Sequence, residues 1–183
     1  PIIVACSRSG DESKIIKTDV CIYGGTSAAV TAAKAVALEG RNAVIICPDP
    51  VIGGLTTGGL GSTDIGNKKA IIGMARQFYR DLGTYYGVDE QWTFEPHVAE
   101  NILMGYIDDP HITLMQGYYL TSVDKKGTRI KSITCTTDEG VKATVNAPVF
   151  IDVTYEGDLM AKAGVSYHVG REDSSVYGEK WNG

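Results

Sequence analysis

The sequence has 183 residues, of which 43% are hydrophobic and 21% are charged, and its formal net charge is −5. This length and balance are typical of an α/β protein with one substantial core. An acidic chain without a run of basic residues is not expected to bind nucleic acid, and no apolar run approaches the roughly 18 residues that a membrane-spanning helix needs.

The first 18 residues are expected to be a leader remnant and a polar tether that precede the folded domain. Small Ala5 stands before Cys6, as at the end of a bacterial lipoprotein signal, and a polar stretch follows at residues 7–14. In this interpretation a lipid on Cys6 anchors the protein to a membrane outside the cytoplasm, for example in the periplasm. The alternative is a short apolar remnant before a linker, which leaves a cytoplasmic location open.

A short apolar strand, a glycine turn and an alanine-rich helix follow one another in residues 19–38. The key positions of the dinucleotide-binding pattern G-x-G-x-x-G/A hold Gly24, Thr26 and Ala29. In such a unit the free N–H groups and the positive dipole end of the helix face a pyrophosphate, and the Thr26 hydroxyl is a further candidate donor to a phosphate oxygen. Taken alone, the pattern fits any tight strand-to-helix turn equally well.

A second strand is predicted at residues 42–47, where it closes a βαβ unit after Gly40 has ended the helix. Cys47 stands where an acidic residue normally binds the adenosine ribose. Cys47 and Asp49 are two residues apart, so in an extended backbone both would point to the same side. Asp49 is therefore a candidate to bind the ribose instead.

A second glycine cluster, residues 53–66, also contains the apolar side chains of Leu55, Leu60 and Ile65. It fits a flexible surface loop, but flexible linkers are mainly polar. The apolar residues favour a loop that lies against a flat ligand.

Helical periodicity predicts helices at residues 69–86 and about 96–107, the second with Pro96 in its first turn. Glu95 and His97 flank this proline. A carboxylate or an imidazole can remove or return a proton, which makes the two residues candidate catalytic groups. They fit a capping carboxylate and a structural histidine at least as well.

The C-terminal part of the sequence changes to short strands, predicted at about 112–116, 118–124, 129–137, 141–146 and 148–153. The four cysteines are spread singly, without a C-x-x-C pair, so the sequence encodes no zinc site, iron–sulfur cluster or redox disulfide. Cys21 and Cys135 lie in apolar or β-rich runs and are expected to be buried packing residues.

Five segments resemble, in the same order, the FAD-dependent oxidoreductases of the glutathione-reductase-like superfamily. They are residues 19–33, 53–61, 63–66, 92–97 and 150–158. In detail they look like a bacterial branch that is distantly similar to the flavin subunit of heterodisulfide reductases. The resemblance implies an α/β, Rossmann-like FAD/NAD(P)-binding domain with a parallel sheet, a helical insert at about 68–108 and an antiparallel β-meander at about 112–146. Because enzymes of this superfamily are much longer, residues 19–183 are expected to be part of such a domain.

The resemblance also implies which residues bind FAD. The first turn would surround the pyrophosphate, residues 47–49 would lie beside the adenosine, and the second glycine turn would follow the ribityl chain. The segment after the last strand would match the family's A-T-G-D motif, although Tyr155 and Glu156 depart from it. The candidates are Gly24, Gly25, Thr26, Ser27, Ala28, Ala29, Cys47, Pro48, Asp49, Gly53, Gly54, Leu55, Thr154, Gly157 and Asp158. His168 and Arg171 lie in a segment that leads towards the substrate side in this family.

These features predict an oxidoreductase that passes a hydride or an electron pair through a non-covalently bound FAD. Its small-molecule substrate and its electron acceptor are left undefined. One alternative is an NAD(P)-binding Rossmann oxidoreductase. Another is a lipid-tethered, non-catalytic binding protein that keeps the fold but has lost the cofactor through Cys47 and Tyr155.

Overall fold

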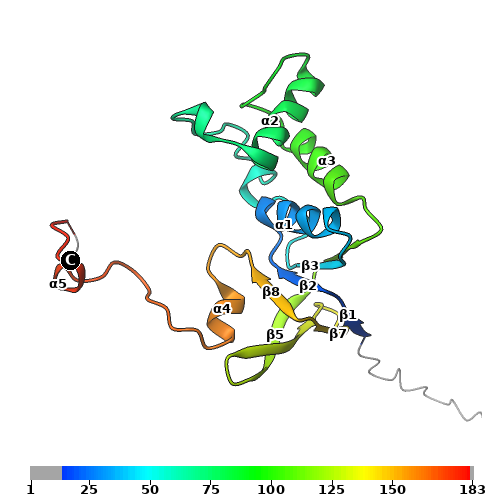
Figure 1. Ribbon diagram of the computed structural model, residues 1–183, viewed down its shortest axis with the longest axis vertical. Helices are drawn as coiled ribbons and strands as arrows, with labels where there is room; N and C mark the ends of the chain where they lie inside the picture. The colour runs from blue at the N-terminus through cyan, green and yellow to red at the C-terminus, as the bar shows by residue number, and fades with distance from the viewer. Residues whose placement is uncertain (1–13, 182–183) are drawn as a thin grey trace, which may run out of the picture.

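The computed structural model describes residues 14–181, which form two four-stranded sheets and a set of helices (Figure 1). The strands are β1 (Lys14–Lys17), β2 (Val20–Tyr23), β3 (Ala43–Cys47), β4 (Ile112–Gln116), β5 (Tyr119–Lys126), β6 (Arg129–Thr136), β7 (Lys142–Asn146) and β8 (Val149–Asp152). The α-helices are α1 (Ser27–Leu38), α2 (Gly73–Tyr86), α3 (Pro96–Ile107), α4 (Asp158–Lys162) and α5 (Ser174–Tyr177), and two short 3-10 turns are η1 (Gly54–Thr56) and η2 (Lys68–Ala70).

The first sheet is parallel throughout and has the strand order β4-β3-β2-β8. The chain leaves β2 through α1 to β3 on one side, and only much later adds β8 on the other side of β2. Ligands of open α/β sheets bind at such a change of direction, beyond the carboxyl ends of the strands. The α/β fold, with a parallel sheet and a second sheet that contains an antiparallel part, agrees with the sequence prediction.

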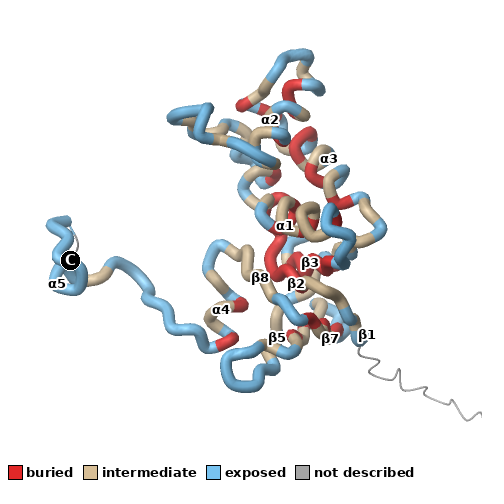
Figure 2. The backbone as a smooth tube through the Cα atoms, in the orientation of Figure 1, coloured by how far each residue is buried: buried red, intermediate tan, exposed pale blue. Residues whose placement is uncertain are grey.

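Both faces of the parallel sheet are covered, which explains why its strands are continuous apolar runs. Ile22 and Ile45 face the helices α1 and α3, whereas Cys21 and Ile46 face the second sheet. Figure 2 shows the resulting buried zone through β2 and β3, at the centre of the molecule. Cys21 and Cys135 are fully buried, as the sequence predicted.

Small residues let α1 lie close to the sheet. Ala29, Val30 and Ala33 are completely buried on one side of the helix, and α3 packs beside α1 with Leu103 in the same core. Pro96 is the first residue of α3, where its missing N–H has no intrahelical partner to lose. Helix α3 therefore has the bounds that the sequence predicted, whereas α2 begins at Gly73, four residues later than expected.

The second sheet has the order β1-β7-β6-β5, and it corrects two expectations. Residues 112–116 do not belong to the meander, because β4 pairs in parallel with β3 at the edge of the first sheet. Residues 14–17 are not part of a tether, because β1 pairs in parallel with β7. The antiparallel part consists of β5, β6 and β7 alone. Both errors concern edge strands, whose partners lie far away in the sequence.

The predicted lipid anchor at Cys6 lies outside the described residues. Among residues 14–181 no helix is both long enough and apolar enough to cross a bilayer. At the other end, the chain after α4 runs away from both sheets towards α5 (Figure 1), and its residues 165–181 are almost all exposed.

Candidate functional site

The carboxyl ends of β2, β3 and β8 meet around one cavity of about 190 Å³. Each strand contributes the residues that follow it: the first glycine turn after β2, residues 48–49 after β3, and residues 154–158 after β8. The lining residues are Gly24, Gly25, Thr26, Pro48, Asp49, Thr154, Tyr155, Glu156 and Asp158. Three segments that lie far apart in the sequence are therefore brought together at the edge where parallel sheets bind ligands.

The first glycine turn is held tightly against its neighbours. The Gly24 N–H donates to the Ile46 carbonyl over 2.9 Å. A Cβ atom added to Gly24 would lie 2.9 Å from the backbone of Val153 and Thr154, and one added to Gly25 would overlap the Cys47 Sγ atom. The turn needs glycine at both positions, because backbone lies against Gly24 and the buried Cys47 side chain lies against Gly25.

Helix α1 begins directly at the cavity, and no side chain caps its positive dipole end. Its first turn, Ser27 to Val30, contains no acidic residue. The side chain of the preceding Thr26 makes no capping hydrogen bond to the helix, and its hydroxyl donates to the Val153 carbonyl over 2.9 Å. This bond corrects the expectation that the Thr26 hydroxyl donates to a phosphate; it ties the first turn to the segment after β8 instead. An anion would meet the helix through its backbone N–H groups and its dipole.

The remaining residues of the first motif, Ser27 to Ala29, do not line this cavity. Ser27 and Ala28 line a neighbouring cavity of about 210 Å³, together with Phe78 and Tyr79 of α2. The side chain of Ala29 is fully buried in the core, so it packs against the sheet and does not face the first cavity.

Cys47 is a packing residue beneath the site and not a ligand contact. Its side chain is fully buried in the core, and the thiol donates to the Asp49 carbonyl over 3.2 Å. Burial raises the pKa of the Cys47 thiol to about 11, so it is neutral at physiological pH. The expectation that Cys47 and Asp49 point to the same side is wrong, because β3 ends at Cys47 and the alternation of an extended strand does not continue. Asp49 is exposed and lines the cavity, as does Pro48.

The second glycine turn is hydrogen-bonded to the first one. The Gly53 N–H donates to the Gly25 carbonyl over 2.6 Å, and Gly53 forms a parallel β-bridge with Thr26. Gly54 has a φ of +59°, and an added Cβ would overlap the Tyr155 hydroxyl. That hydroxyl accepts a hydrogen bond from the Leu55 N–H over 2.7 Å. The sequence predicted Tyr155 only as a departure from the motif, whereas the structure uses it to join the second turn to the third segment.

The third segment is organised by Asp152, which the sequence reasoning did not single out. Its Oδ1 atom accepts bonds from the Thr154 N–H over 3.0 Å and the Thr154 hydroxyl over 2.7 Å, and its Oδ2 atom accepts one from the Met160 N–H over 2.8 Å. The Thr154 hydroxyl in turn accepts from the Asp158 N–H over 2.9 Å. Gly157, at a φ of +72°, lets the chain turn into α4. An aspartate at a strand end with threonine two residues later is the signal that could have identified this turn.

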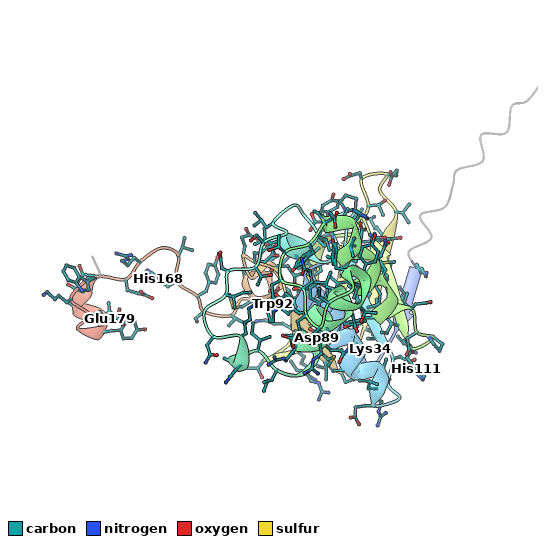
Figure 3. All side chains as sticks on the ribbon, turned by 90° about the horizontal axis from the view of Figure 1, so that it is seen from above. Lys34, Asp89, Trp92, His111, His168 and Glu179 are labelled. Atoms are coloured by element: carbon teal, nitrogen blue, oxygen red, sulfur yellow. The ribbon has the colours of Figure 1, made fainter. Side chains whose placement is uncertain are left out.

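The two candidate catalytic residues lie elsewhere. Glu95 and His97 are exposed at the start of α3, and neither lines the cavity at the glycine turn. The Tyr86 hydroxyl donates to the Glu95 carboxylate and accepts from the Glu95 N–H over 3.0 Å. Figure 3 shows His168 on the extended C-terminal segment, well away from Trp92 in the body of the protein. Arg171, on the same segment, donates to the Trp181 carbonyl over 3.0 Å.

The polar groups that line the cavity indicate which parts of a dinucleotide each of them could bind. The side chains that line it carry three carboxylates, at Asp49, Glu156 and Asp158, and no basic group. A pyrophosphate would therefore depend on backbone N–H groups and on the α1 dipole, while carboxylates suit the hydroxyl groups of a sugar. Within residues 14–181 no group of three or more His, Cys, Asp or Glu residues could hold a metal ion.

Comparison with known proteins supports this interpretation. The sequence profile described as FAD dependent oxidoreductase matches residues 19–182. No curated protein sequence gives a significant match.

Several solved structures share the fold. A flavoprotein/dehydrogenase from Cytophaga hutchinsonii is 15% identical with a TM-score of 0.61, and the match covers 85% of this chain and 44% of that one. A geranylgeranyl bacteriochlorophyll reductase-like protein from Thermoplasma acidophilum is 14% identical with a TM-score of 0.59, covering 87% and 45%. THI4 of Thermovibrio ammonificans is 17% identical with a TM-score of 0.58, covering 87% and 69%. The chain thus spans less than half the length of the first two proteins, and at these identities the likeness concerns the fold.

Proposed function

Because the chain belongs to the FAD dependent oxidoreductase family, we propose that the cavity at the carboxyl ends of β2, β3 and β8 is where it binds the pyrophosphate and adenosine of FAD. The observation that carries this proposal is the convergence of the first glycine turn, residues 48–49 and the segment after β8 around one cavity at the start of α1, which no side chain caps. The second glycine turn is hydrogen-bonded to the first turn and to Tyr155. The bound flavin would supply transfer of a hydride or an electron pair.

The chain's own groups would bind and orient this cofactor. Gly24 and Gly25 bring backbone close to the pyrophosphate, and the dipole of α1 favours its negative charge. Asp49 after β3 would accept hydrogen bonds from the adenosine ribose, and Asp158 would do so from hydroxyl groups further along the cofactor. No basic side chain among the cavity's lining residues is then needed.

The finer identity is also a proposal. The order of the five motif segments supports kinship with the bacterial branch that resembles the flavin subunit of heterodisulfide reductases. The chain covers 44% and 45% of two structures that share its fold. This coverage supports the proposal that further segments of a longer protein complete the flavin pocket and contact a small-molecule substrate and an electron acceptor.

The direct test is the absorbance spectrum of the purified full-length protein, followed by release of any chromophore in acid. We expect flavin bands and release of FAD, rather than FMN or NAD, in a one-to-one ratio with the protein. Release of NAD would favour the nicotinamide alternative. A colourless protein that takes up no added FAD would contradict the proposal and favour a non-catalytic binding protein.

Replacement of Asp49 tests the adenosine end of the site. Because the carboxylate is exposed, Asp49→Ala should leave the urea midpoint nearly unchanged. Loss of a charged hydrogen bond to the ribose should weaken FAD binding by roughly 10- to 100-fold. FMN lacks the adenosine, so titration of the apoprotein with FMN is the matched control and should show no change. Equal weakening for FAD and FMN would contradict a contact between Asp49 and the ribose.

A further inference from the structure

Tyr155 joins the segment after β8, which lines the cavity, to the second glycine turn. Its hydroxyl accepts the Leu55 N–H over 2.7 Å, a contact between residues that are 100 positions apart in the sequence. The same side chain lines the cavity. The bond therefore connects the segment after β8 directly to the second glycine turn.

Gly54 makes this contact possible. A Cβ atom at this position would overlap the Tyr155 hydroxyl, would lie 3.1 Å from the ring carbon that carries the hydroxyl, and would lie 3.2 Å from the Cα atom of Thr26. The Tyr155 ring thus lies directly against the backbone of Gly54, close to the point where the first and second turns meet. Because Gly53 also donates to the Gly25 carbonyl, a shift of the second turn would move the first turn with it.

The bond is poorly placed to stabilise the fold as a whole. Tyr155 is 60% exposed, and Leu55 is also exposed. A neutral hydrogen bond in contact with water contributes little to the free energy of unfolding. The placement of this bond at the cavity suggests a different role.

We propose that Tyr155 is a positioning residue for FAD: its hydroxyl, through the Leu55 N–H, holds the second glycine turn closed against the first turn and so preorganises the cavity for the cofactor. The inference rests on the proposed function. Preorganisation increases affinity because the binding step no longer includes the ordering of the two turns. The tyrosine that departs from the family's A-T-G-D motif would then aid cofactor binding, contrary to the alternative interpretation in which Cys47 and Tyr155 abolish it.

The test compares Tyr155→Phe with the wild-type full-length protein after removal of any flavin. Phenylalanine keeps the ring and removes only the hydroxyl. We expect a roughly 3- to 10-fold higher FAD dissociation constant, measured by quenching of flavin fluorescence, with an unchanged urea midpoint. Hydrogen exchange at the Leu55 amide of the apoprotein should become faster, which reports the bond without any cofactor. Tyr85→Phe, on the exposed surface of α2, is the matched control and should change neither quantity.

The outcomes separate this inference from the proposed function. If wild-type protein takes up no FAD, the proposed function fails, and the inference fails with it. If wild-type protein binds FAD and Tyr155→Phe binds it equally well, only the inference is overturned. Tighter binding by the variant would also overturn it, because the hydroxyl would then be competing with the cofactor for the Leu55 N–H. A lower urea midpoint with unchanged affinity would show a purely structural role.

Discussion

Replacing Gly25 by alanine is expected to destabilise the protein by about 1–3 kcal/mol, although only one methyl group is added. The new Cβ would overlap the Cys47 Sγ atom, which is fully buried in the core between the sheet and α1. A buried side chain at a strand end cannot move away without shifting the backbone of β3. The urea midpoint of the apoprotein measures the change.

A second substitution identifies the cause of this effect. Cys47→Ala removes the Sγ atom that Gly25→Ala meets, so the double variant should be more stable than the sum of the two single changes predicts. Gly105→Ala is the matched control. Gly105 lies within α3, and its Cβ would meet no atom within 4 Å, so alanine should be neutral or stabilising by up to about 1 kcal/mol. Additive effects at Gly25 and Cys47 would contradict a direct clash.

Asp152→Asn is expected to cost about 2–3 kcal/mol of stability and to weaken FAD binding at the same time. The Asp152 carboxylate accepts three hydrogen bonds, two from Thr154 and one from the Met160 N–H. The asparagine side chain has one acceptor oxygen, so its NH₂ group would face a donor on one side. The turn between β8 and α4 would lose its anchor, and this turn carries Thr154 and Asp158 into the cavity.

The same chemical change six residues later provides the contrast. Asp158 is exposed, and it contacts the Thr154 hydroxyl through its backbone N–H, which the substitution leaves in place. Asp158→Asn should therefore weaken the binding of FAD and cost at most about 0.3–1 kcal/mol of stability, from the lost charge at the start of α4. Equal stability of the Asp152 and Asp158 variants would show that the carboxylate of Asp152 does not organise the turn.

Local sequence signals predicted those elements whose structure depends on near neighbours. The βαβ unit follows from an apolar run, a glycine turn and a run of alanines, which are adjacent in the sequence. The start of α3 follows from Pro96, because proline fits the first helical turn and no later one. The buried state of Cys21 and Cys135 follows from the apolar runs around them.

The errors arose where a residue's partner lies far away in the sequence. The residues of β1 were predicted to be a tether, and those of β4 were predicted to belong to the meander. Nothing in either strand's own residues specifies its parallel neighbour, which is β7 for β1 and β3 for β4. Cys47 was predicted as a ligand contact because it stands at the strand end where an acidic residue normally binds the ribose, but its side chain is buried in the core. Asp49 was predicted to share its side because the alternation of the strand was extended past its last residue. The hydroxyl of Thr26 was predicted to donate to a phosphate, but it donates to the carbonyl of Val153, which is 127 positions away in the sequence.

The sequence by itself determined an α/β domain, because glycine turns and apolar periodicity are local signals. The flavin-dependent family came from the resemblance of five ordered motif segments, which the match over residues 19–182 supports. Only the tertiary structure decided which atoms of those motifs face the cavity. Gly25 is required by the Cys47 thiol, Gly54 by the Tyr155 hydroxyl, and the turn at Thr154 by the Asp152 carboxylate. Steric fit and hydrogen bonding act over a few ångströms in space, so they pair residues in ways that the order of the chain does not reveal.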